Sequence, residues 1–250
     1  MAQMRRVAAS RPVNARIQQF HNGTPYDWPT SFRVGHAGVG KQDRSIAVSL
    51  TFCALSGGSA EHNAYLNRMT AAAIPNTHVG ASVTEDVKLN WKSRIEERWS
   101  AAWFVAVDGT GDPLEQYKIE FDFTWVTDST TADYTVVAVK TSSPTSPADG
   151  TINTLYWGVD DGGHTGAAIA HEFGHLIGNP DEYGTCTFKG RNATNNARSI
   201  MCDETNGTAR PGHFWLIGKE IAALLNTPVD RARIRVGVET YDVSFDHPWL

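Results

Sequence analysis

The segment from His171 to Asp181, HEFGHLIGNPD, constrains this chain more than any other stretch of its sequence. His171 and His175 are four residues apart, and on a helix this spacing places both imidazoles on one face, with Cβ atoms about 6 Å apart. Two imidazoles in this arrangement can bind one zinc ion. Glu172 then lies close enough to take a proton from the water that zinc polarises. The segment therefore predicts a helix that carries a catalytic zinc site, with Glu172 as general base.

The residues after His175 predict that the chain turns back toward the metal. Gly178 can adopt the left-handed conformation that ends a helix, and Pro180 prevents the helix from resuming. Asp181 follows this turn, and a carboxylate oxygen is an accepted zinc ligand. The predicted ligands are therefore His171, His175 and Asp181. An ordinary turn is the alternative for Asp181, because Asn, Pro and Asp all favour turns.

This segment resembles the extended metzincin motif HExxHxxGxxH/D in its Asp form, as in snapalysin-type bacterial metallopeptidases. The resemblance covers residues 84–225 and implies a zincin-like fold, one Zn²⁺ per chain and hydrolysis of peptide bonds. It also implies a methionine turn beneath the zinc, for which Met201 is the candidate, as a packed side chain and not a ligand. For Tyr183, the resemblance implies that the phenol stabilises the oxyanion. The edge strand that holds an extended substrate would be residues 152–158.

Several other residues could in principle contribute to such a site. His213 could replace Asp181 as third ligand, and His164 could line the cleft. Glu182 or Glu204 could serve as the third ligand in the zinc-peptidase pattern that takes a glutamate from a later helix. A lone histidine is more often hydrogen-bonded or exposed than bound to metal, and the turn before Asp181 favours Asp181 as the ligand.

Periodicity along the chain predicts an α+β fold, with a mixed twisted sheet, an active-site helix and a loop-rich C-terminal half. Expected strands are 45–55, 117–126, 134–140, 152–158 and one or more within 233–245. Expected helices are 61–73, 84–103 with Thr84 as its cap, the motif helix from Thr165, and 211–225. Residues 1–43 lack clear periodicity and are expected to be an irregular N-terminal extension, with the catalytic domain over 44–250.

Composition limits the partners of the chain. A net charge of -5 and the lack of a long basic run argue against nucleic acid, so a protein or peptide substrate is the expected partner. No stretch approaches the roughly 20 apolar residues of a membrane span. The N-terminus lacks the apolar run of a signal peptide, so we expect export or injection by a dedicated secretion system, as an effector or toxin, or else a cytoplasmic protein. A monomer is the expected state.

Two structural features stay open at this level. One disulfide between Cys186 and Cys202 would be compatible with the three cysteines, the third being Cys53. Structural Ca²⁺ could bind a carboxylate-rich loop at 160–161 or 203–204.

The function predicted from these residues is that of a zinc-dependent endopeptidase. Two alternatives use the same zinc site. One is a binding or toxin module that keeps the peptidase fold without turnover, and the other is a zinc amidase that acts on small or cell-wall peptides. Glu172 favours an enzyme, because a purely structural zinc site needs no base and is closed by four protein ligands.

Overall fold

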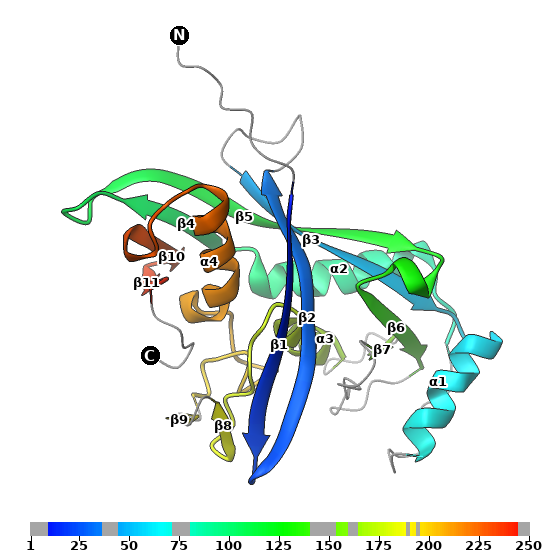
Figure 1. The fold of residues 1–250 in the computed structure, drawn as a ribbon. Coiled ribbons are helices and arrows are strands. Elements are labelled where there is room, and N and C mark those ends of the chain that lie inside the picture. Colours follow the sequence, from blue (N-terminus) through cyan, green and yellow to red (C-terminus); the bar gives the residue numbers. More distant parts are fainter. Residues whose placement is uncertain are drawn as a thin grey trace.

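A computed structural model of the 250-residue chain describes residues 10–36, 45–71, 81–140, 154–159, 165–188, 191–193 and 196–244. These residues form an α+β fold in which a few helices pack on one mixed, twisted, open sheet (Figure 1). The general fold class predicted from periodicity is thus confirmed. No helix in these ranges has the length and apolar character needed to cross a membrane.

The sheet runs in the order β11-β10-β4-β5-β3-β2-β1-β8-β9, and β6 and β7 branch from β3. β3 is parallel to β5 and β6, and β6 is parallel to β7, whereas the other pairs are antiparallel. The strands are β1 (Arg11–His21), β2 (Thr24–His36), β3 (Ser45–Leu55), β4 (Ala102–Val107), β5 (Pro113–Val126), β6 (Tyr134–Val139), β7 (Thr154–Gly158), β8 (Cys186–Phe188), β9 (Arg191–Asn192), β10 (Ala232–Val236) and β11 (Glu239–Asp242).

The N-terminal segment differs from its expected irregular structure. β1 and β2 form a long antiparallel hairpin, which turns at Asn22 and Gly23 with φ of 50° and 79°. Asn-Gly at such positive φ values is the preferred two-residue hairpin turn. The expectation of irregular structure over residues 1–43 is therefore wrong for 10–36. Its cause is the polar Gln19 and Thr30 at buried positions, which interrupt the apolar alternation of the two strands.

The helices lie where the sequence predicts them, but their bounds differ, and the first four residues of the predicted helix over 211–225 form a 3-10 helix. Thr84 caps α2 (Glu85–Trp99) by accepting a hydrogen bond from Val87 N, as predicted. The predicted helix over 84–103 is too long, because Trp103 lies on β4. Leu89, expected on its apolar face, is 63% exposed. The other helices are α1 (Ala60–Ala71), α3 (Thr165–Leu176) and α4 (Trp215–Leu224), with short 3-10 helices η1 (Ser129–Thr131), η2 (Pro211–Phe214) and η3 (Val229–Arg231).

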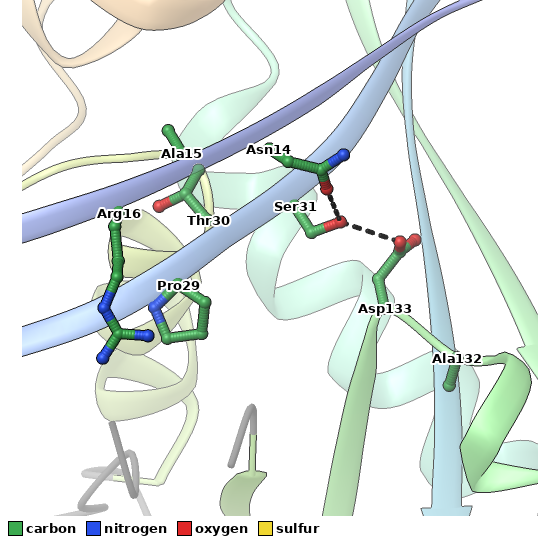
Figure 2. A pocket seen from close by; sticks show the side chains of 8 residues that line it. All are labelled: Asn14, Ala15, Arg16, Pro29, Thr30, Ser31, Ala132 and Asp133. Atoms are coloured by element: carbon green, nitrogen blue, oxygen red, sulfur yellow. Dashed lines mark hydrogen bonds between the residues drawn. The ribbon is translucent and has the colours of Figure 1, made fainter. Parts of the chain in front are cut away.

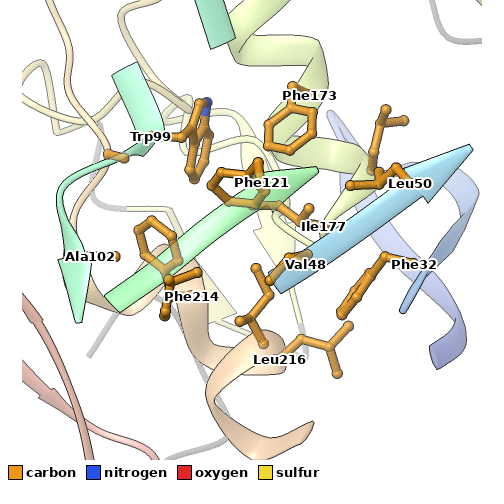
Figure 3. Close-up of a cluster of buried hydrophobic side chains, with 14 of the residues drawn as sticks. Phe32, Val48, Leu50, Trp99, Ala102, Phe121, Phe173, Ile177, Phe214 and Leu216 are labelled. Carbon is orange, nitrogen blue, oxygen red and sulfur yellow. The ribbon is translucent and has the colours of Figure 1, made fainter. Parts of the chain in front are cut away.

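Hydrophobic side chains pack in two clusters, one on each face of the sheet. Alternate residues of the strands point to a large cluster in which Trp99 of α2, Phe173 of α3 and Phe214 meet Phe121 of β5 (Figure 3). The intervening residues of β3, β6 and β7 form a smaller cluster, against which Tyr65 of α1 packs. α1 therefore lies on the opposite face of the sheet from α2 and α3. Successive side chains of a strand point to opposite faces of the sheet, so a strand that is buried on both faces contributes alternate residues to the two clusters.

The sheet forks on one side of β3. The first half of β3 pairs with β2, and its second half pairs with β6. At the fork, Ser31 Oγ lies 3.0 Å from Asn14 Oδ1 and 2.9 Å from Asp133 Oδ1 (Figure 2). Asp133 Oδ2 accepts a hydrogen bond from Thr51 N. A pocket lies at this fork, lined by residues of β1 and β2 and by Ala132 and Asp133, which directly precede β6. The contact between Ser31 and Asp133 thus joins the hairpin to the residues that lead into β6.

Candidate metal centre

Helix α3 ends at the turn that the sequence predicts. Gly178 has φ of 99°, and its N–H donates to the carbonyl oxygen of His175 at 3.0 Å. Asn179 N and Asn179 Nδ2 both donate to the carbonyl oxygen of Gly174. These bonds satisfy carbonyls that the helix end leaves without an intrahelical partner. The chain then reverses and brings Asp181 back beside the helix.

The reversal brings the three predicted ligands together. Asp181 Oδ1 lies 3.1 Å from His171 Nε2 and 3.3 Å from His175 Nε2. The two imidazole rings are nearly perpendicular, with centroids 5.1 Å apart. Within the described ranges, His171, His175 and Asp181 are the one group of His, Cys, Asp or Glu side chains that could hold a metal ion.

Both histidines are oriented by backbone carbonyls. His171 Nδ1 lies 2.8 Å from Ile200 O, and His175 Nδ1 lies 2.7 Å from Asn179 O. A carbonyl oxygen only accepts, so each Nδ1 carries the proton, and each neutral imidazole presents a lone pair at Nε2. Two lone pairs and a carboxylate oxygen then face one another. Such a cluster of acceptors requires a cation between them, either a metal ion or a proton on each ring.

Charge within the site shifts the pKa values of these groups. Burial alone would lower the pKa of His171, but the hydrogen bond and charge of Asp181 raise it to about 9. Burial would raise the pKa of Asp181, but the two histidines hold it below its usual range. Burial raises the pKa of Glu172 to about 7, although the charges of His175 and His171 oppose this rise. The cluster therefore binds positive charge strongly.

Glu172 and Tyr183 flank the ligands. Glu172 follows His171 on α3, is half-buried, and has no side-chain hydrogen bond to any described residue, so its carboxylate is available to a bound water. The Tyr183 ring stacks on the ring of His171, with centroids 6.0 Å apart and planes at 24°. Tyr183 is half-buried, and burial raises the pKa of its phenol well above the usual value, so the phenol keeps its proton.

Met201 lies against the motif helix, where the sequence predicts a packed methionine. Its side chain is fully buried, and a Cβ on Gly174 would collide with Met201 Sδ and would lie 3.0 Å from Trp99. Met201 O accepts a hydrogen bond from Glu182 N at 2.9 Å. Gly174, between the two histidine ligands, is therefore required for this close approach, a role that the sequence alone did not indicate.

The alternative ligands are placed elsewhere. His213 is buried, and its Nε2 lies 3.1 Å from both Glu182 Oε1 and Ser199 Oγ, while Arg210 N donates to its Nδ1. His213 and Glu182 therefore pair with each other and do not join the metal group. One nitrogen of His213 faces both Ser199 and Glu182, so the three do not form a serine-hydrolase relay, which uses both ring nitrogens. Glu204 is likewise outside the metal group.

The N-terminal hairpin adds residues that the sequence did not predict. Trp28 Nε1 and Thr30 Oγ1 donate to the carbonyl oxygen of His175, and the Trp28 ring lies edge-on to the His175 ring at 4.9 Å. Gln19, which is 1% exposed, contacts Asp181 with both ends of its amide. The available signal was the pattern in β1, where Gln19 continues the inward-facing series of Val13 and Ile17.

The disulfide, the calcium loops and His164 are left open by the sequence. No disulfide joins Cys53, Cys186 and Cys202, all of which lie in the described part of the chain, so the possible Cys186–Cys202 bridge is absent. The carboxylate of Asp203 accepts hydrogen bonds from the N–H groups of Thr205 and Asn206, as an ordinary turn does. His164 and the loop at 160–161 lie outside the described residues.

Comparisons with protein-family models, with curated proteins and with solved structures found no match to this chain.

Proposed function

We propose that this chain is a zinc-dependent endopeptidase with a metzincin-like catalytic site. The observation that carries the proposal is the convergence of His171 Nε2, His175 Nε2 and Asp181 Oδ1, with each Nδ1 held by a carbonyl oxygen. A histidine that binds zinc through one ring nitrogen usually donates a hydrogen bond from the other, often to a backbone carbonyl oxygen, which orients the ring. Glu172, adjacent to the first ligand, supplies the base.

The donor set fits zinc. Ligands at about 2.0–2.1 Å from a tetrahedral zinc lie about 3.3 Å from one another. The two distances from Asp181 Oδ1 to the histidine nitrogens, 3.1 and 3.3 Å, agree with this spacing. Nitrogen and carboxylate ligands are typical of catalytic zinc, and three protein ligands leave the fourth position for water or substrate.

Zinc, when bound, would supply a Lewis acid that lowers the pKa of a water and polarises the substrate carbonyl. The Glu172 carboxylate would accept the proton of that water as it attacks the peptide carbonyl, and would then pass a proton to the leaving amine. Tyr183 would donate its phenolic hydrogen to the oxyanion that develops on the carbonyl. Asp181 and the two histidines would keep the metal in place throughout.

An extended peptide would bind along β7. Among the described strands, β7 pairs only with β6, so within this part of the chain it is an edge strand. Such an edge can accept a further strand by backbone hydrogen bonds, with specificity from pockets for alternate side chains. β7 also contacts α2, because Trp91 Nε1 donates to Gly158 O at 2.8 Å, so the edge is tied to the helical layer.

Two alternative functions would use the same centre. A binding or toxin module would hold zinc without turnover, and a zinc amidase would act on small or cell-wall peptides. The half-buried Glu172, without a hydrogen bond from the described residues, favours an enzyme over a purely structural site. Export by a dedicated secretion system and a monomeric state also remain predictions, to be tested by secretion assays and by analytical ultracentrifugation.

The deciding experiment measures zinc content and casein hydrolysis for the wild type, His175→Ala and Glu172→Gln. We expect one zinc per chain in the wild type and in Glu172→Gln, loss of zinc in His175→Ala, and loss of hydrolysis in both variants. Zinc without casein hydrolysis would lead to a peptide-library and cell-wall-peptide panel, which separates a narrow peptidase or amidase from a binding module. Absence of zinc from the reconstituted wild type would refute the proposal.

A further inference from the structure

Gln19 is a buried amide that connects the N-terminal hairpin to the metal centre. Its Oε1 accepts a hydrogen bond from Asp181 N at 2.7 Å, and its Nε2 donates to Asp181 Oδ2 at 3.1 Å. The second Nε2 hydrogen points to Cys186 Sγ at 3.4 Å. The orientation of the amide is fixed, because the backbone N–H of Asp181 requires an acceptor and its carboxylate requires a donor.

We propose that Gln19 is a positioning residue that fixes the Asp181 carboxylate so that Oδ1 alone faces the two histidine ligands. This inference rests on the proposed zinc site. It adds to that site a residue from a strand 162 positions earlier in the chain. The hydrogen bonds of the Gln19 side chain go to Asp181 and Cys186 and not to the histidine nitrogens, so it acts through Asp181.

The two oxygens of the Asp181 carboxylate have different partners, which supports this role. Oδ1 lies 3.1 and 3.3 Å from the histidine nitrogens, whereas Oδ2 receives the Gln19 amide. A hydrogen bond to one carboxylate oxygen favours binding of a metal through the other oxygen. Without Gln19, Asp181 could rotate and present both oxygens, which would change the coordination number.

The strand pairing explains how Gln19 reaches the site. β1 pairs with β8 in the register Gln19↔Phe188 to His21↔Cys186, directly after the ligand segment. At the tip of the hairpin, Asn22 N donates to Thr185 O at 3.1 Å. The hairpin and the segment that carries Asp181 are thus joined by backbone bonds on one side and by the Gln19 amide on the other.

The test replaces the amide with a side chain of similar length that can neither donate nor accept, Gln19→Met. The matched control is Gln18→Met, because Gln18 is the exposed neighbour on the same strand. Zinc affinity, measured by chelator competition, is expected to fall about 10- to 100-fold in Gln19→Met and to stay unchanged in the control. The visible spectrum of the Co²⁺-substituted protein is expected to change in Gln19→Met only. If Gln19→Met does not fold, Gln19→Asn, whose amide is too short to reach, takes its place.

A second pair of variants separates positioning from a general structural role. If Gln19 acts through Asp181, then Gln19→Met in the Asp181→Ala background has no further effect on zinc affinity, because the two changes are coupled. An equal loss in both backgrounds, or an unchanged affinity and Co²⁺ spectrum in Gln19→Met, would overturn the inference. Failure of the wild type to bind zinc would instead refute the proposed function. This outcome is distinguishable from failure of the inference, because it is measured on the wild type alone.

Discussion

His171 Nδ1 donates to the carbonyl oxygen of Ile200 at 2.8 Å, and Ile200 directly precedes Met201, whose side chain packs against the next turn of the motif helix at Gly174. One loop therefore both orients a ligand and supports the helix that carries it. Ser199 Oγ accepts from Met201 N, and Ile200 N donates to Thr208 O, so the loop is itself held from two sides. The packing of this loop is therefore expected to influence metal binding, because it sets the orientation of His171.

Gly174→Ala is expected to destabilise the protein by about 1–3 kcal/mol, the usual cost of forcing atoms into a well-packed core. The added methyl group would collide with Met201 and press on Trp99. Urea denaturation of the metal-free protein measures the change. Gly109→Ala is the control, because a Cβ there meets nothing closer than Arg231 at 4.0 Å. Equal stability of the two variants would show that Met201 does not pack as described.

Removal of zinc by a chelator is expected to lower the melting temperature of the wild type. A ligand that binds only the folded state stabilises it by RT ln(1 + [L]/Kd), which is about 2.7 kcal/mol at a hundredfold excess over Kd. Scanning calorimetry with and without chelator measures the effect. His175→Ala is expected to show no response to chelator, and a response equal to that of the wild type would place the zinc elsewhere.

Tyr183→Phe is expected to lower kcat by about 10²–10³ while zinc content and KM change little. The Phe ring can keep the stacking on His171, so only the phenolic donor is lost. Steady-state kinetics on a peptide that the wild type cleaves, with zinc content measured in parallel, checks this. An unchanged kcat would assign Tyr183 to packing alone.

Stability at acidic pH is expected to depend on Glu182. Burial would raise the pKa of Glu182, but the hydrogen bonds with His213 and Ser199 and the positive charge nearby together hold the pKa below its ordinary 4.5. A carboxyl group with a depressed folded-state pKa stabilises the protein above its unfolded pKa, and this contribution is lost as the pH falls through the folded value. Stability should therefore fall as the pH drops below about 4.5, the ordinary glutamate value.

Glu182→Gln tests the origin of this acid dependence. The amide can still accept from His213 but does not titrate, so the variant is expected to be less stable at pH 7 and to lose less stability between pH 7 and pH 3. Thermal melting across this range compares the two proteins. Parallel curves for wild type and variant would show that other carboxyl groups cause the acid dependence.

The residues of the candidate metal centre could be predicted from the sequence better than the residues that surround them. His171, His175 and Asp181 could be placed because helical spacing and a glycine stop fix their positions locally. Gln19 and Trp28 could not be placed, because their roles depend on strand pairing across more than a hundred residues, which periodicity does not reveal. The general α+β class could be predicted from alternating strands and a capped helix, but the fork of the sheet at β3 could not.

Errors at element boundaries have physical causes. Trp103 continues the helical spacing of α2, yet Ser100 ends that helix and the chain enters β4, where the indole lies under the guanidinium of Arg235 at 5.8 Å. A large aromatic residue satisfies either pattern, so spacing alone could not decide.

The 162-residue separation between Gln19 and Asp181 has a consequence for how the chain matures during synthesis. Domains emerge from the ribosome N-terminal end first, so the first hairpin is complete long before the strand that it will pair with exists. Until then, the edge of β1 that will meet β8 has no native partner and is open to other chains. The contact between Gln19 and Asp181 is therefore a late event, which follows the synthesis of the segment that carries the ligands.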